Sequence, residues 1–199
     1  MAKSIMNALN LLKKLLSRII TRVFYSFFFQ SIGKKTTIYK PYLLANTQHI
    51  TIGKNCSLRK GLRLEVVQPA KDLVISIGNN VNIEQNVHII GHISIKIGNN
   101  VSIAGHCSIV DVVHPYEDIH NEQKIGERIS HDPFPVSIGD STFIGFGAHI
   151  APGVSVGRNC IIGANSVVTK NIPDYSVVAG NPAKVIKKYD FEEQAWVRI

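Results

Sequence analysis

The first 64 residues contain no acidic side chain. The chain has 199 residues and 22 Lys and Arg side chains, of which 12 precede Glu65. From Glu65 onward there are 10 basic and 14 acidic side chains. The net charge of +8 is therefore +12 on residues 1–64 and −4 on residues 65–199. A uniformly basic protein is excluded. No aromatic-basic RNA surface or DNA-reading motif accompanies the basic segment, so we expect no nucleic-acid partner.

Cysteine is also scarce. The chain has three, at Cys56, Cys107 and Cys160, and no CxxC pair. Three cysteines in a chain of this length do not make a disulfide framework, and their spacing does not predict a zinc site. We therefore expect a reducing compartment, a cytoplasmic protein and no metal requirement.

A long uninterrupted apolar run is missing too. A membrane-spanning helix needs about 20 predominantly apolar residues, but four basic residues, Lys13, Lys14, Arg18 and Arg22, interrupt the apolar N-terminal stretch. These charges lie inside the apolar region rather than before it, which argues against a cleaved signal peptide.

The same stretch predicts an amphipathic helix over residues 1–30, because no Gly or Pro occurs before Gly33. One apolar stripe contains Ile5, Leu9, Leu12, Leu16, Ile19 and Val23. Two interpretations remain open. The helix either lies on the inner face of the cell membrane as a peripheral contact, or packs on its own domain or a partner subunit.

From residue 50 onward, aliphatic residues recur every six positions within blocks. The inward positions predicted by this spacing are Ile52, Leu58, Leu64, Ile77, Ile83, Ile89, Ile97, Ile103, Ile109, Ile138, Ile144, Ile150, Val156, Ile162 and Val168. Gly and Asn often follow these residues and suit tight turns. Three short faces make an 18-residue coil, so Ile138 should stack on Val156, and neighbouring coils should supply one another's core.

The repeat divides the chain into a helix at 1–30, a coiled domain at 31–188 and a C-terminal tail or short helix at 189–199. Residues 171–188 are expected to form an extended capping loop. The longest interruption, a loop excursion at 110–137, contains three histidines and three prolines. Long loops inside compact repeats are usually functional, so this loop is the first place to look for an active site.

Two phrases near the C-terminus carry a family resemblance: IGANSVVTKNIP at 162–173 and GNPAKVI at 180–186. Together with the repeat and the loop they resemble the hexapeptide-repeat acyltransferases. The resemblance implies an all-β left-handed parallel β-helix, a homotrimer with active sites between subunits, and acetyl-CoA as co-substrate.

Within that family the chain is most similar to the sugar and polysaccharide O-acetyltransferases. The resemblance implies that His114, followed by Pro115, is the general base. Asp111 is a second candidate catalytic residue, either orienting His114 or binding the acceptor; a turn residue bonded to backbone is the alternative. Tyr116 matches the polysaccharide branch and is a candidate substrate contact. Val112 stands where that branch has another histidine.

The remaining expected contacts also come from the resemblance. Asn86 matches an acceptor-binding asparagine, with a corner residue in left-handed geometry as the alternative. Coenzyme A is expected to contact Gly147, Ala148, Ala164, Thr169, Lys170 and Lys187. Small side chains would leave room for the pantetheine arm, and the lysines would pair with phosphates.

The function predicted from the sequence is acetyl-CoA-dependent O-acetylation of a saccharide hydroxyl in cell-surface polysaccharide biosynthesis. The acceptor is a saccharide, either lipid-linked or nucleotide-activated. A nucleotide-sugar N-acyltransferase, a zinc hydratase built on the same coil and a non-catalytic solenoid used for binding or assembly remain alternatives.

Overall fold

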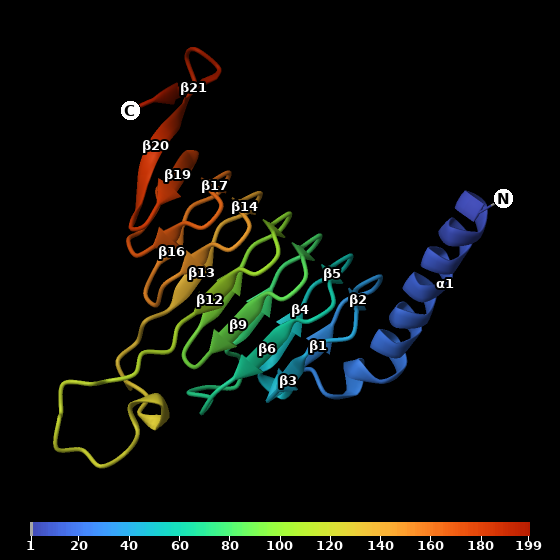
Figure 1. Ribbon diagram of the computed structural model, residues 1–199, viewed down its shortest axis with the longest axis horizontal. Coiled ribbons are helices and arrows are strands. Elements are labelled where there is room, and N and C mark those ends of the chain that lie inside the picture. The colour runs from blue at the N-terminus through green and yellow to red at the C-terminus, as the bar shows by residue number, and fades with distance from the viewer. Residues whose placement is uncertain (1) are drawn as a thin grey trace.

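The computed structural model describes residues 2–199, except for the side chains of residues 2–5 and 8. After an N-terminal helix, short strands joined by turns form three sheets that are parallel except at the C-terminal end (Figure 1). Each turn of the chain adds one short strand to each of three sheets, named here A, B and C. Sheet A contains β1 (Ser31–Ile32), β4 (Ile50–Ile52), β7 (Ile75–Ile77), β10 (Ile95–Ile97), β13 (Val136–Ile138) and β16 (Ser155–Val156).

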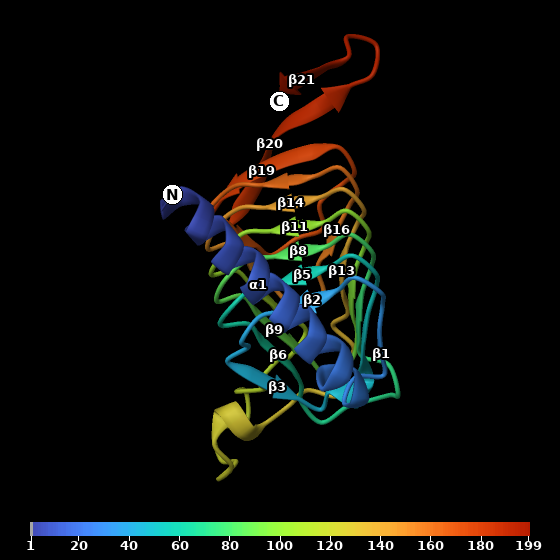
Figure 2. The ribbon, with the colours of Figure 1, turned by 90° about the vertical axis from the view of Figure 1, so that its right-hand side faces the viewer.

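Sheets B and C complete the coils in the same way. Sheet B contains β2 (Thr37–Ile38), β5 (Ser57–Leu58), β8 (Asn82–Ile83), β11 (Ser102–Ile103), β14 (Phe143–Ile144), β17 (Ile161–Ile162), β19 (Ser176–Gly180), β20 (Ala183–Asp190) and β21 (Ala195–Arg198). Sheet C contains β3 (Leu43–Ala45), β6 (Arg63–Val66), β9 (His88–Gly91), β12 (Ser108–Val110), β15 (His149–Ile150) and β18 (Val167–Val168). Figure 2 shows these strands stacked as the walls of one solenoid.

The core is the column of aliphatic side chains inside the coils. All fifteen inward positions predicted from the six-residue spacing are buried. The predicted stacking is also confirmed, since Ile138 pairs with Val156 and Ile144 with Ile162. The three cysteines lie inside the coil as well. Burial of this column is the main favourable contribution to stability, because apolar area removed from water contributes about 25 cal/mol per Å².

The coils begin one turn before residue 50, where the predicted six-residue repeat starts. Ile32, Ile38 and Leu44 continue the spacing of six, and they pair with Ile52, Leu58 and Leu64. β1 begins at Ser31.

Residues in left-handed backbone geometry form two of the three corners. Between sheets A and B they include Asn55, Asn80, Asn100 and Asn159; between sheets B and C they include Gly61, Asn86, His106, Gly147 and Asn165. Asparagine and glycine tolerate this geometry better than other residues. The third corner, between sheets C and A, carries the insertions, and the longest of them is the loop between β12 and β13.

Helix α1 (Ala2–Val23) and the 3₁₀ turn η1 (Tyr25–Phe27) precede the coils. The helix is shorter than the predicted range 1–30. After the helix and η1, Phe29 enters the core and the Gln30 amide donates to the Ile50 carbonyl, which brings the chain into the first coil. Figures 1 and 2 show the helix lying across the N-terminal coils, with its N-terminal end standing away from them. Within residues 2–199, no helix is both long and apolar enough to cross a membrane.

The C-terminus corrects two expectations. The capping loop and the short helix are replaced by strands: β19 pairs in parallel with β17, and β20 and β21 follow as an antiparallel ribbon. The side chains of β20 alternate between half-buried and exposed, a period of two that fits a strand and not a helix. Tyr189 opposes Trp196 with ring centroids 5.4 Å apart, and such cross-strand aromatic pairs stabilise a ribbon.

Candidate active site

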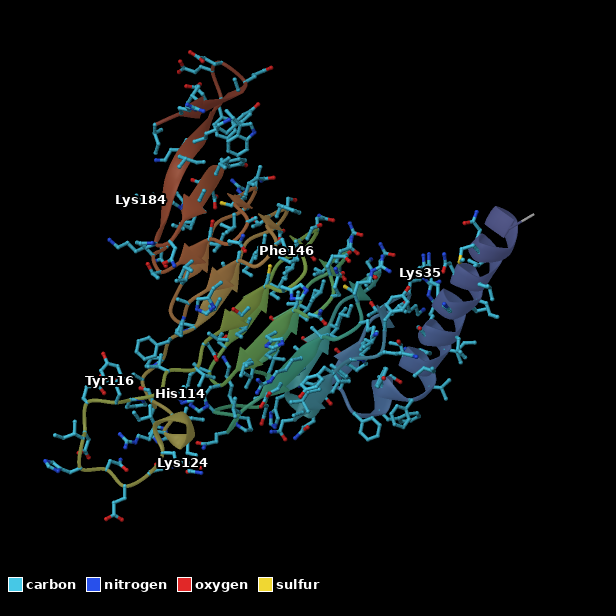
Figure 3. All side chains as sticks on the ribbon, viewed as in Figure 1. Lys35, His114, Tyr116, Lys124, Phe146 and Lys184 are labelled. Atoms are coloured by element: carbon cyan, nitrogen blue, oxygen red, sulfur yellow. The ribbon has the colours of Figure 1, made fainter. Side chains whose placement is uncertain are left out.

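The loop that carries His114 leaves sheet C after β12 and returns to sheet A at β13 (Figure 3). Its only regular element is the 3₁₀ turn η3 (Ile125–Glu127). The loop extends away from the solenoid and most of its side chains are exposed. Its conformation must therefore be held mainly by its own polar contacts.

Arg128 supplies those contacts. Its guanidinium donates to three backbone carbonyls of the loop: Nε to Gln123 at 2.8 Å, Nη1 to Asp118 at 3.0 Å and Nη2 to Asn121 at 2.6 Å. Hydrogen bonds from a charged donor are stronger than neutral ones. Arg128 was not identified from the sequence, because no spacing or motif marks an arginine whose partners are all carbonyls.

His114 is tied to the same residue. Its Nδ1 lies 2.7 Å from the carbonyl oxygen of Arg128. A carbonyl oxygen only accepts, so Nδ1 carries the hydrogen in this contact and Nε2 of a neutral ring holds the free lone pair. The His114 side chain is exposed. This tautomer leaves a proton acceptor directed away from the loop backbone.

The Asp111 carboxylate bonds to backbone, as in the alternative given for it above, but to the backbone of a neighbouring coil. Its side chain is 1% exposed, and its two carboxylate oxygens accept from the backbone amides of His92, Ile93 and Ser94 at 2.6–2.9 Å. Among residues 2–199 no hydrogen bond joins Asp111 to His114. Asp111 begins the loop after β12, and its carboxylate fixes the turn between β9 and β10 in the neighbouring coil.

Tyr116 lies further out in the loop. Its side chain is exposed, and its backbone amide donates to the Glu117 carboxylate. Pro115 and Arg128 line an open pocket of about 320 Å³ on the loop. The ring of Tyr116 is thus accessible to a partner from outside.

Asn86 sits at the corner between sheets B and C, in the left-handed geometry that was expected as its alternative role, with φ of 55°. Its Nδ2 lies 3.2 Å from Nε2 of His106, whose ring packs on Phe146. The loop leaves the corner between sheets C and A, so one chain does not bring Asn86 to His114. Figure 3 shows the separation: Phe146 and His114 lie at opposite edges of the coils.

Two of the residues expected to contact coenzyme A share the corner between sheets B and C. Gly147 has φ of 70°, and a Cβ there would lie 2.4 Å from Oδ1 of Asn165, so a larger residue would require the Asn165 side chain to move. Ala164 is exposed at the same corner. Ala148 is a correction: its side chain is 0% exposed and belongs to the core, so it cannot line an outer groove.

The other expected cofactor contacts lie elsewhere. Thr169 and Lys170 are exposed after β18, and Lys187 is half-buried on β20. All three lie, like Ala164, at the C-terminal end of the solenoid. Thr169 and Lys170 are at the corner after β18, and Lys187 is on the ribbon.

Sheet C has a polar outer face beside the loop. Ser108 and His149 are register partners there, and the serine Oγ lies 2.7 Å from Nδ1 of the histidine. Burial lowers the pKa of His149 below its ordinary 6.5. In the described part of the chain, no three His, Cys, Asp or Glu side chains gather closely enough to hold a metal ion.

Comparisons with known proteins identify the family to which this coiled chain belongs. Residues 135–170 match the family model described as bacterial transferase hexapeptide (six repeats). The chain is 33% identical over 183 residues to the Escherichia coli K12 protein named as a lipopolysaccharide biosynthesis O-acetyltransferase, WbbJ; the match covers 89% of this chain and 88% of that protein. The chain belongs to the hexapeptide-repeat acyltransferases.

Two further matches refine the placement of this acyltransferase. It is 41% identical over 115 residues to the galactoside O-acetyltransferase of Escherichia coli K12, covering 57% of this chain and spanning about half, 54%, of that protein. A solved structure of galactoside acetyltransferase in complex with coenzyme A superposes with a TM-score of 0.55 at 27% identity, over 83% of this chain and 68% of that one.

Proposed function

We propose that this protein is an acetyl-CoA-dependent O-acetyltransferase that modifies a saccharide hydroxyl in cell-surface polysaccharide biosynthesis. The similarity to WbbJ along nearly the whole chain is the observation that carries the proposal. The relative solved with coenzyme A supports the choice of co-substrate. The acceptor is a saccharide, either lipid-linked or nucleotide-activated.

His114 is the general base. Its free Nε2 takes the proton of the acceptor hydroxyl as that oxygen attacks the thioester carbonyl carbon. A backbone N–H from a coil stabilises the oxyanion of the tetrahedral intermediate. Collapse of the intermediate breaks the C–S bond, the imidazolium returns its proton to the departing sulfur, and the products are an acetyl ester and free coenzyme A.

The site is completed between subunits of a homotrimer of left-handed β-helices. The separation of Asn86 from His114 within one chain supports this, because an acceptor that contacts both needs the corner of one subunit beside the loop of the next. Asn86 and Tyr116 bind the acceptor. Asp111 supports the base indirectly, through the turn that it fixes at the root of the loop.

The groove for coenzyme A runs along the last coils. Gly147 and Ala164 leave room for the pantetheine arm at the corner between sheets B and C, and Thr169 contacts the cofactor at the next corner. Lys170 and Lys187 hold the phosphates. Their positions at the C-terminal end of the solenoid, on different corners, again favour a groove that two subunits line.

Residues 1–30, which contain α1, are the leader of this enzyme, residues 31–188 are its catalytic domain, and residues 189–199, which end the ribbon, are its tail. The catalytic domain works on the cytoplasmic side, where acetyl-CoA is made, and the leader provides a peripheral contact with the inner face of the membrane.

The test is a screen with purified protein, acetyl-CoA and a panel of sugars, nucleotide sugars and lipid-linked oligosaccharides. Acceptor-dependent release of the coenzyme A thiol is measured, and the product is treated with mild base. An ester that base removes supports O-acetylation. A base-stable amide would instead establish the N-acyltransferase, and no acetyl-CoA binding at all would leave a non-catalytic solenoid.

A further inference from the structure

Helix α1 turns its polar side toward its own domain. Thr21 is 1% exposed, and its hydroxyl accepts from the amide of Ile38 in β2 at 2.8 Å while donating to the carbonyl of Ser17 at 2.7 Å. Nε of Arg18 is buried in the same contact. These residues fix which side of the helix faces the first coil.

The apolar side of the helix consequently points outward. Leu9, Leu12, Leu16, Ile19 and Val23 are 45–63% exposed. Successive residues turn by about 100°, which puts Leu12, Leu16 and Val23 roughly 140–180° around the helix from Thr21. An amphipathic surface helix normally buries this stripe against its own core. Here the arrangement is reversed, so the stripe is left for a partner outside the chain.

The residues after the helix continue the same character. Phe24, Phe27 and Phe28 are exposed, Phe27 to 81%. An exposed apolar surface of this extent marks an interaction site. Aromatic side chains suit a membrane interface because they are readily accommodated at the boundary between headgroups and acyl chains.

The charges decide what kind of partner fits. Lys13 and Arg22 border the stripe on its two sides, and both are exposed. The first 64 residues carry 12 basic and no acidic side chains. A second copy of this helix would bring the same positive charge to the contact, whereas anionic lipid headgroups would neutralise it.

We propose that the outer face of α1, formed by Leu9, Leu12, Leu16, Ile19 and Val23 and extended by Phe24 and Phe27, binds an anionic lipid bilayer. The helix lies in the plane of the interface, with the stripe among the acyl chains and Lys13 and Arg22 at the headgroups. The polar side stays on the solenoid and holds the first coil against the membrane surface. The inference does not depend on acetyl transfer.

The test is co-sedimentation of the full chain with vesicles. Vesicles of phosphatidylglycerol and phosphatidylethanolamine should bind the wild-type protein, and phosphatidylcholine vesicles should bind it on the order of tenfold less. Leu16→Asp should lower binding to the anionic vesicles by about tenfold or more. Asn10→Asp is the matched control, because it makes the same charge change at an exposed position off the stripe, and it should bind far better than Leu16→Asp.

The oligomeric mass of the wild-type protein and both variants is measured in parallel by light scattering. An unchanged mass with lost vesicle binding supports the proposal. Dissociation of the oligomer by Leu16→Asp would overturn it and make another subunit the partner of the stripe. Equal binding of the two variants to anionic vesicles, or no binding by the wild-type protein, would overturn it as well. Thiol release with a water-soluble acceptor reports separately on the enzyme.

Discussion

Nδ1 of His114 donates to the backbone carbonyl of Arg128, 2.7 Å away, and the guanidinium of that same arginine holds three other carbonyls of the loop. One residue thus sets both the shape of the loop and the tautomer of the proposed base. From this relationship we predict that Arg128 is a positioning residue, which affects catalysis through the orientation of His114.

Replacing Arg128 should therefore disturb catalysis more than folding. Arg128→Lys keeps the positive charge but cannot reach three carbonyls, since an ammonium lacks the planar fork of a guanidinium. We expect kcat to fall by about 10- to 100-fold, because small displacements of a catalytic group are costly, with the KM for acetyl-CoA little changed. Lys124→Gln, an exposed change in the same loop, is the control. Equal kcat for Arg128→Lys and the wild-type enzyme would refute the positioning role.

Asp111 offers a choice between two roles. Asp111→Asn replaces one carboxylate oxygen by an NH₂ group that faces backbone amides, so buried hydrogen bonds are lost at a cost of roughly 2–3 kcal/mol. We expect the thermal unfolding midpoint to fall by roughly 5–10 °C.

The pH profile of kcat separates this structural role from a catalytic one. If Asp111 only supports the turn, the activity that remains should keep the pH profile of the wild-type enzyme. A shifted profile with an unchanged unfolding midpoint would show instead that Asp111 orients His114.

The three cysteines should be inert in the folded protein. Burial is the largest cause that raises the pKa of each thiol above 9.0, and the Cys107 thiol donates to the Gly145 carbonyl. Thiolate is the reactive form, so a raised pKa slows reaction. Titration with dithiobis(nitrobenzoate) should detect three thiols only after unfolding. Rapid reaction of even one thiol in the native state would contradict the buried positions.

The stability should fall on acidification, in part because of His149. Burial lowers the pKa of this residue below 6.5 in the folded state, so between 6.5 and the lowered value the unfolded chain binds more protons. Stability contributed by the neutral ring is present above 6.5 and is lost as the pH drops through that window. His149→Gln should reduce the loss of unfolding midpoint between pH 7 and 5, whereas His120→Gln, at an exposed loop position, should not. Parallel curves for all three proteins would count against the assignment.

The solenoid was predictable because its core repeats locally. Ile138, Ile144 and Ile150 each face inward once in six residues, so spacing alone identifies them. The C-terminal ribbon was mispredicted because Tyr189 and Trp196 stabilise it through a long-range strand pair that no local periodicity specifies.

The site was predictable only in part. The loop and His114 follow from the break in the repeat and a family motif. The partners of Asp111 belong to another coil, and the guanidinium of Arg128 bonds only to backbone carbonyls. Neither contact depends on the residue type of the partner, so neither can be predicted from the sequence. Within one chain Asn86 and His114 lie at different corners of the coils, and a site that brings them together between subunits stays a proposal.

The most direct measurement of the central claim is acceptor-dependent release of the coenzyme A thiol by the wild-type enzyme and by His114→Ala, with His120→Ala as a control for loop perturbation. Loss of a general base typically costs about 10²- to 10⁴-fold in rate. We predict a decrease of that size in kcat for His114→Ala, with acetyl-CoA binding and the unfolding midpoint retained, and wild-type turnover for His120→Ala. Equal turnover by His114→Ala and the wild-type enzyme would contradict the proposed mechanism.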